Sequence, residues 1–126
     1  MKPLASVVQM IVRVLGLVQI VLGLLFWAGI ALGLRDLHML IGIVIVLLLW
    51  TLAALAAAAR VGVALPLTGF VVGLVTVWLG LTQERLLPGG GHWVIRVLHL
   101  LVGLAALGLA DVLGTRVKRS GAPATA

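Results

Sequence analysis

Four long apolar stretches, separated by short polar or glycine-rich segments, constrain the fold of this chain more than any other feature. The first runs from about Ser6 to Trp27, the second from about Arg35 to Ala59, the third from near Pro66 to Thr82, and the fourth from about Trp93 to Val112. A membrane-spanning helix needs about 20 apolar residues. The sequence therefore predicts an all-α fold, an integral membrane four-helix bundle.

The composition leaves little room for anything outside the bilayer. Of 126 residues, 63% are hydrophobic and only 10% are charged, so we expect one transmembrane domain and no soluble domain. The absence of cysteine excludes disulfides, thiolate catalysis and iron–sulfur clusters. The net charge of +6 comes from basic residues spread over the ends of the expected helices, which favours contacts with membrane lipid over binding to nucleic acid.

The basic residues also predict an orientation. The end that carries both termini would hold six of them and the opposite end three: Lys2, Arg13, Arg60, Arg116, Lys118 and Arg119 against Arg35, Arg85 and Arg96. Cytoplasmic loops carry an excess of Lys and Arg. We therefore expect a protein of the cell (inner) membrane with both termini in the cytoplasm and the opposite end toward the outer side.

Two pairs of similar segments indicate an internal duplication. RDLHMLIG at Arg35–Gly42 resembles RVLHLLVG at Arg96–Gly103, and GLVQIVLGL at Gly16–Leu24 matches GLVTVWLGL at Gly73–Leu81 at six of nine positions. Each half thus consists of a span with two glycines at the same spacing, here called the glycine span, followed by a span with one of the two histidines, here called the histidine span. The expected architecture is two parallel two-helix repeats, at about 6–60 and 63–115, followed by a basic, disordered tail at 116–126.

His38 and His99 occupy corresponding places in the two halves and are the candidate metal ligands. Ionisable residues inside a membrane are costly and usually mark function. In two antiparallel helices, residues equally far from the connection between them lie at equal depth. This places Gly23 level with His38 and Gly80 level with His99. Two imidazoles from opposite helices of a bundle can fill both axial positions of one haem iron.

Further residues complete a predicted cofactor site. Glycine lets a planar macrocycle approach the helix backbone, which is the role expected of four residues on the first and third spans, Gly16, Gly23, Gly73 and Gly80. Gly42 and Gly103 follow each histidine by four residues and belong to the same set. Arg35 and Arg96 lie about one turn outside the histidines, where they could pair with two haem propionates.

Paired histidines on the second and fourth helices, with glycines on the first and third, resemble the four-helix core of membrane b-type cytochromes. That family usually has two histidines on each ligand helix and two haems, so one histidine on each helix implies a single haem b with bis-histidine ligation. VWLGL at Val77–Leu81 and WVIRVLHLLVG at Trp93–Gly103 also resemble one half of the haem A synthase family.

The resemblance to haem A synthases implies haem binding without the hydroxylation chemistry. In that family an acidic residue stands three positions before a haem-ligating histidine, whereas this chain has Arg35 or Arg96 there. The family's extramembrane cysteine pair is also absent.

The function expected from these patterns is electron transfer within the membrane by a small b-type cytochrome. Its partner could be a quinone or a membrane redox protein, and the chain could act as a homo-oligomer or as a subunit of a larger complex. A six-coordinate iron leaves no open position for substrate, which favours electron transfer over catalysis.

Four alternatives stay open. The chain could be a haem-modifying enzyme, a small four-span transporter, or a structural subunit without a cofactor, and the two histidines could serve only as interhelical hydrogen-bonding groups. A cation transporter usually needs a buried carboxylate. Glu84 and Asp111 instead lie near helix ends, where we expect pairing with Arg85 or with a basic residue of the tail.

Overall fold

The computed structural model describes residues 1–120, which form four α-helices. They are α1 (Lys2–Trp27), α2 (Arg35–Ala58), α3 (Ala64–Thr82) and α4 (His92–Arg119), with short 3-10 helices at Leu32–Leu34 and Gln83–Arg85. All four α-helices are long and apolar enough to cross a membrane, and the described residues contain no β-strand. The expected all-α class and the number of spans are confirmed.

Two boundaries differ from those expected. Helix α1 begins at Lys2 rather than Ser6, because Pro3 suits the first turn of a helix, where its missing N–H donor has no partner to lose. Helix α4 continues to Arg119, so the disordered tail expected from residue 116 is wrong for residues 116–119. Basic side chains there stabilise the negative end of the helix dipole. Residues 121–126 lie outside the described part of the chain.

The two turns that set the depth of the histidines are where the sequence places them. Gly29 has a φ of +76° directly after α1, and Gly89 has a φ of +90° before α4. This left-handed conformation is accessible to glycine at little cost. Each glycine span therefore folds back on its histidine span as a hairpin.

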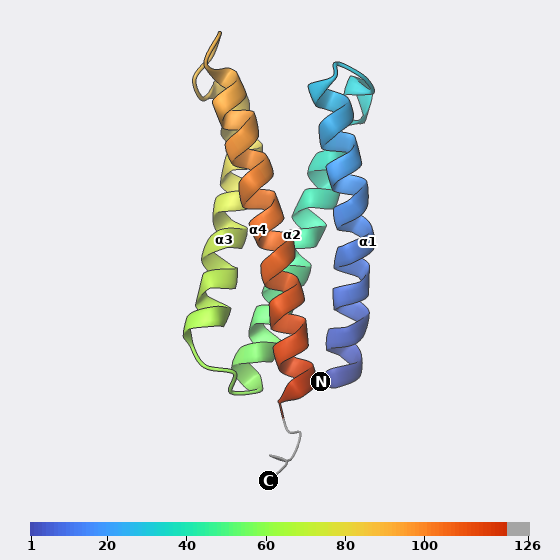
Figure 1. Ribbon diagram of the computed structural model, residues 1–126, viewed down its shortest axis with the longest axis vertical. Coiled ribbons are helices and arrows are strands. Elements are labelled where there is room, and N and C mark those ends of the chain that lie inside the picture. The colour runs from blue at the N-terminus through green and yellow to red at the C-terminus, as the bar shows by residue number, and fades with distance from the viewer. Residues whose placement is uncertain (121–126) are drawn as a thin grey trace.

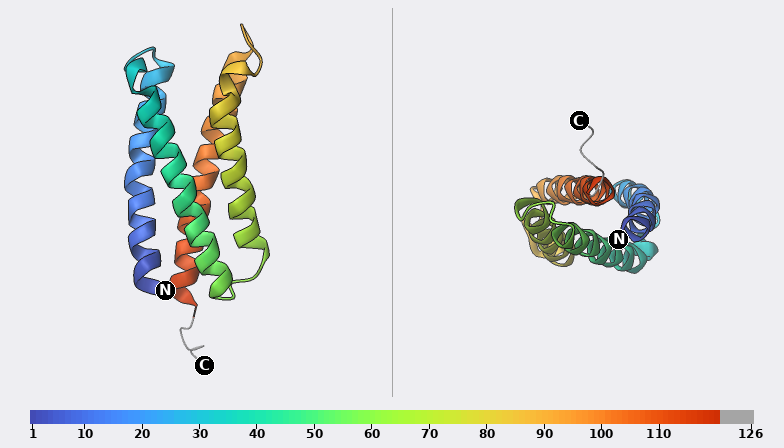
Figure 2. Two further views of the ribbon diagram at one scale, coloured as in Figure 1. Left: turned by 180° about the vertical axis from the view of Figure 1, so that it is seen from behind. Right: turned by 90° about the horizontal axis from the view of Figure 1, so that it is seen from below.

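The bundle consists of two hairpins, α1 with α2 and α3 with α4, that diverge along their length. The hairpins lie close together at the end that carries the N-terminus and the α2–α3 connection, and they separate toward the two hairpin turns (Figures 1 and 2). Helices α2 and α4 contact each other, whereas α1 and α3 occupy opposite corners of the bundle without contact.

The hydrophobic core is concentrated at the closed end, where α2 crosses α4. Small side chains on both helices let their backbones approach, and four of them are almost fully buried, Ala53, Ala56, Ala106 and Ala110. Leu49, Leu52 and Leu113 fill the spaces between them and have no exposed surface. Few residues are buried at the diverging end, so the core gives way to a cavity there.

Polar side chains also join α1 to α4 at the closed end. Asp111 accepts hydrogen bonds at 2.8 Å from Gln9 Nε2 and from Arg13 Nε. Asp111 therefore pairs with Arg13, near the middle of α1. Arg13 is thereby held at a carboxylate of the neighbouring helix. The sequence had suggested a basic residue of the tail as the partner of Asp111, and that expectation is wrong.

We expect Leu49→Ala to destabilise the bundle by about 2–5 kcal/mol, the usual cost of emptying a buried leucine site. Leu49 is fully buried at the crossing of α2 with α4, whereas Leu47 on the same helix is 52% exposed. The measurement is thermal unfolding in a mild detergent, with Leu47→Ala as the matched control. Equal unfolding midpoints for the two variants would contradict a core located at the closed end.

Candidate cofactor site

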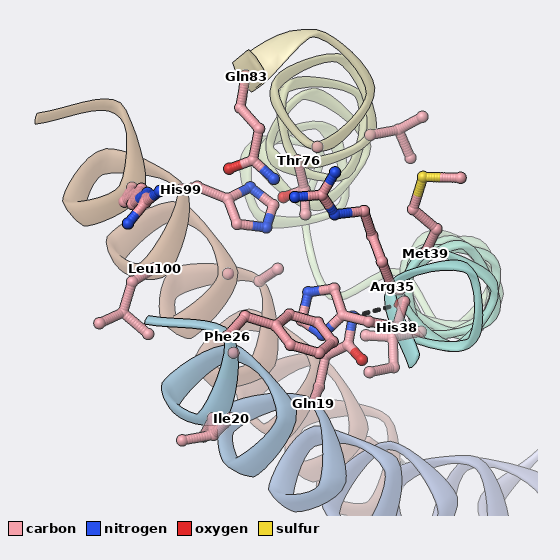
Figure 3. Close-up of a pocket in the computed structure, with 18 of the residues that line it drawn as sticks. Gln19, Ile20, Phe26, Arg35, His38, Met39, Thr76, Gln83, His99 and Leu100 are labelled. Carbon is pink, nitrogen blue, oxygen red and sulfur yellow. Dashed lines mark hydrogen bonds between the residues drawn. The ribbon is translucent and has the colours of Figure 1, made fainter. Parts of the chain in front are cut away.

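A cavity of about 310 Å³ opens between the two hairpins at their diverging end. All four helices contribute to its walls, and most of the lining side chains are apolar (Figure 3). The polar side chains that line it include Gln19, His38, Thr76, His99 and, near the hairpin turns, Arg35. Pockets of about 300–1,000 Å³ with apolar walls and a few polar groups are typical of small-molecule and cofactor sites.

His38 from α2 and His99 from α4 approach each other from opposite walls of this cavity (Figure 3). Their ring centroids are 6.4 Å apart and the ring planes are inclined by 52°. The Nδ1 atom of each ring is buried and has no hydrogen-bond partner among the described residues. An unpaired buried polar atom is costly, so the two rings need a partner that these residues do not supply.

Gly23 and Gly80 provide the space that the two imidazoles occupy. A Cβ atom added at Gly23 would lie 3.7 Å from His38 Cε1, and one added at Gly80 would lie 3.4 Å from His99 Cε1. Each glycine is thus level with the histidine of its own hairpin, which confirms the depths expected from the turns. Both glycines bring helix backbone against an imidazole edge, a contact the sequence did not reveal.

The other four glycines of the expected site separate into two groups. Gly42 and Gly103 line the cavity, where Gly42 leaves room for the Gln19 amide. Gly16 and Gly73 do not line it. A Cβ at Gly16 would lie 2.7 Å from Leu107 Cδ2, and one at Gly73 would meet Trp50 Nε1, so both serve the close packing of neighbouring helices.

Arg35 and Arg96 both line the cavity, as expected of residues one turn outside the histidines. Arg35 forms an ion pair with Glu84, which also lines the cavity and follows α3. This pair links the two hairpins near their turns. The sequence had suggested Arg85 or the tail as the partner of Glu84. Arg35 was not expected, because it comes near Glu84 only when the two hairpins pack together.

Two side chains that hold His38 were not in the expected site. Gln19 Nε2 donates a hydrogen bond of 2.8 Å to the His38 carbonyl, and Gln19 Oε1 is buried without a partner among the described residues. Phe26 meets the His38 ring edge-on, with the centroids 5.3 Å apart. The signal for Gln19 was present, since an uncharged polar residue in an apolar span usually has a partner inside the bundle. Phe26 gave no such signal.

The separation of the two imidazoles suits a shared metal. A metal–imidazole nitrogen bond is about 2 Å long, and each nitrogen lies roughly 1 Å from its ring centre, which gives roughly 6 Å between two rings on opposite sides of one ion. The observed 6.4 Å agrees with this value.

Residues 1–120 contain no cluster of three or more His, Cys, Asp or Glu side chains that could hold a metal ion by themselves. Two imidazoles leave further positions of a metal ion to other ligands, which a bound macrocycle can supply, as in a haem. Comparison with protein families, curated proteins and solved structures found no match to this chain. The geometry of the cavity therefore carries the functional argument.

The packing role of Gly73 leads to a test by substitution. We expect Gly73→Ala to lower the unfolding midpoint, because the added Cβ would collide with Trp50 Nε1 and one helix must shift. Gly103→Ala should leave the midpoint unchanged or raise it slightly, since its Cβ meets nothing within 4 Å and alanine favours a helix by about 1 kcal/mol. Thermal unfolding in detergent measures both. A Gly73→Ala protein as stable as the parent would refute the assignment.

Proposed function

We propose that this protein is a small membrane b-type cytochrome that binds one haem b through His38 and His99 and transfers electrons within the membrane. The observation that carries the proposal is the pair of facing imidazoles, 6.4 Å apart, in a largely apolar cavity between two hairpins. Two buried ring nitrogens without partners make a purely structural role for these histidines costly. Interhelical hydrogen bonding, the simplest alternative, is not formed by either ring among the described residues.

Different residues around the cavity would have different roles in binding a haem. His38 and His99 would hold the iron through their ring nitrogens, and Gly23 and Gly80 would let their rings lie close to the backbone of α1 and α3. Gln19 fixes the backbone at His38 through its hydrogen bond to the carbonyl. The apolar side chains of the walls would exclude water, which influences the reduction potential of a bound metal.

Basic residues near the hairpin turns would face the carboxylates of the group. Arg96 lines the cavity and has no ion-pair partner among the described residues, and Arg35 lines it while paired with Glu84. A haem carries two propionates, and charge-assisted hydrogen bonds from arginine are the strong kind. We propose Arg96 as the first propionate partner and Arg35 as the second, with Glu84 competing for Arg35.

A bound haem b would supply one-electron redox chemistry. Ligation by two histidines leaves no open position on the iron, so electron transfer is favoured over haem modification or other catalysis. The proposed partner is a quinone or a membrane redox protein, because the chain offers little surface outside its four helices. A cation transporter is disfavoured, since Glu84 and Asp111 have side chains that are 62% and 46% exposed.

The proposal includes the symmetry and the orientation expected from the sequence. We propose that the two hairpins are parallel repeats, a view supported by the equivalent contacts of Gly23 with His38 and of Gly80 with His99. The N-terminus and the end of α4 lie at the closed end of the bundle (Figure 1). That end holds more of the basic residues, which supports a cytoplasmic location for the termini and an outward location for the haem.

Absorption spectroscopy tests the haem assignment. We expect protein purified from cells supplied with haem to show a Soret band and the sharp reduced α-band of a six-coordinate haem b. His38→Ala and His99→Ala should each lose the six-coordinate spectrum, and the double variant should lose the haem. His92→Ala is the matched control, because His92 lines the cavity but its Nδ1 lies 3.2 Å from the Leu86 carbonyl oxygen. Colourless parent protein, or a double variant that retains full haem, would refute the proposal.

Thiol labelling tests the orientation, since the chain has no cysteine of its own. Single variants Gly90→Cys and Ser120→Cys place a thiol at opposite ends of the bundle. In intact cells, a membrane-impermeant maleimide should label Gly90→Cys and spare Ser120→Cys until the membrane is opened. The reverse pattern would place the termini outside.

A further inference from the structure

The ion pair between Arg13 and Asp111 lies on the outer surface of the bundle, away from the cavity. Their side chains are 64% and 46% exposed, although they are only 2.5 Å apart. Gln9, which is 2% exposed, anchors the pair from within by donating to Asp111. A polar network that is buried on one side and open on the other is unusual in a helix bundle of this hydropathy.

The depth of this pair makes its exposure significant. Arg13 is eleven residues from the start of α1 and fourteen from its end, or about 17 Å and about 21 Å at 1.5 Å per residue. The hydrocarbon layer is about 30 Å thick, so a helix of this length places Arg13 well inside it. Charged groups at such depth almost always face other protein or a water-filled cavity. Lipid chains would leave the exposed part of this pair unsolvated.

The pair has one unused donor group and one unused acceptor. Both side chains that bond the Asp111 carboxylate, Gln9 and Arg13, do so at Oδ1, which leaves Oδ2 without a partner among the described residues. Arg13 donates through Nε and one terminal nitrogen, which leaves its other terminal nitrogen free among the same residues. A surface that presents one arginine donor beside one carboxylate acceptor is complementary to itself.

A groove beside Arg13 extends this surface. Its volume is about 290 Å³, and apart from Arg13 it is lined by apolar residues of α1 and α4, Val12, Gly16, Leu17, Ile20 and Leu107. Leu17 is 66% exposed at the edge of the groove. The same face thus offers a polar pair, a protruding leucine and a hollow that can receive an apolar side chain.

We propose that the α1–α4 face is the interface of a parallel homodimer, in which Arg13 of each copy donates to Asp111 of the other. All copies insert with the same orientation, so a two-fold axis along the membrane normal brings equivalent depths together. Each copy then supplies the donor and the acceptor that the other lacks, and Leu17 enters the partner's groove. Neither Arg13 nor Asp111 lines the histidine cavity, whereas Ile20 and Leu107 line both the cavity and the groove.

Single-cysteine cross-linking in lipid vesicles at low protein density tests the dimer, since the chain has no native cysteine. Leu17→Cys places a thiol in the proposed interface, and the matched control Leu74→Cys, 61% exposed on α3, places one at the opposite corner of the bundle. With a short bifunctional maleimide, Leu17→Cys should give several-fold more dimer of the 13.1 kDa chain than Leu74→Cys.

Exchanging the charges of Arg13 and Asp111 separates an effect on the interface from an effect on folding. Arg13→Gln should reduce the Leu17→Cys cross-link several-fold, whereas Arg13→Asp combined with Asp111→Arg should restore it, because the exchanged pair is again complementary to itself. Circular dichroism confirms the helical content of each variant. Equal cross-linking of the two cysteine variants, or monomer alone, would each overturn the proposal.

Discussion

The close packing of α2 against α4 at the closed end is the interaction on which the rest of the structure depends. Between helices in lipid there is no hydrophobic driving force, so association relies on van der Waals contact between backbones that approach closely. Ala53, Ala56, Ala106 and Ala110 are buried in one core cluster near this crossing, together with Leu49. Helices that are joined at one end and inclined to each other must separate at the opposite end. The cavity is the consequence of that geometry.

The diverging end brings the two histidines into one cavity without direct contact between them. His38 extends from α2 and His99 from α4, and their rings lie at a similar depth because each histidine is about equally far from its hairpin turn. The surroundings are unequal, since Gln19 and Phe26 hold His38 and no corresponding contacts hold His99 among the described residues. The two histidines therefore have similar glycine contacts but different side-chain supports.

The two ion pairs among the described residues each join different parts of the bundle. Arg35 pairs with Glu84 across the two hairpins, and Arg13 pairs with Asp111 across α1 and α4. Such pairs cost little to form when the alternative is an unsolvated charge in hydrocarbon. They join elements that are distant in the sequence, which is why proximity along the chain misassigned both carboxylates.

Much of the fold could be predicted from the sequence, because spanning helices follow from local hydropathy and hairpin turns follow from local glycines. The helix ends near Trp27 and Thr82 and the common depth of Gly23 with His38 needed only residue counting. The helical continuation to Arg119 was missed, since a polar segment beyond a span has no hydropathy signal.

What the sequence by itself determined is the class, the number of spans and the set of residues from which a site could be built. The tertiary structure decided which of them meet. It brought His38 and His99 to opposite walls of one cavity, and it assigned Gly16 and Gly73 to helix packing. The seven-residue spacing of the glycines places them all on one side of a helix, but the inclination of the hairpins determines which part of that side faces the cavity. That inclination depends on side chains from all four helices, so no single stretch of sequence encodes it.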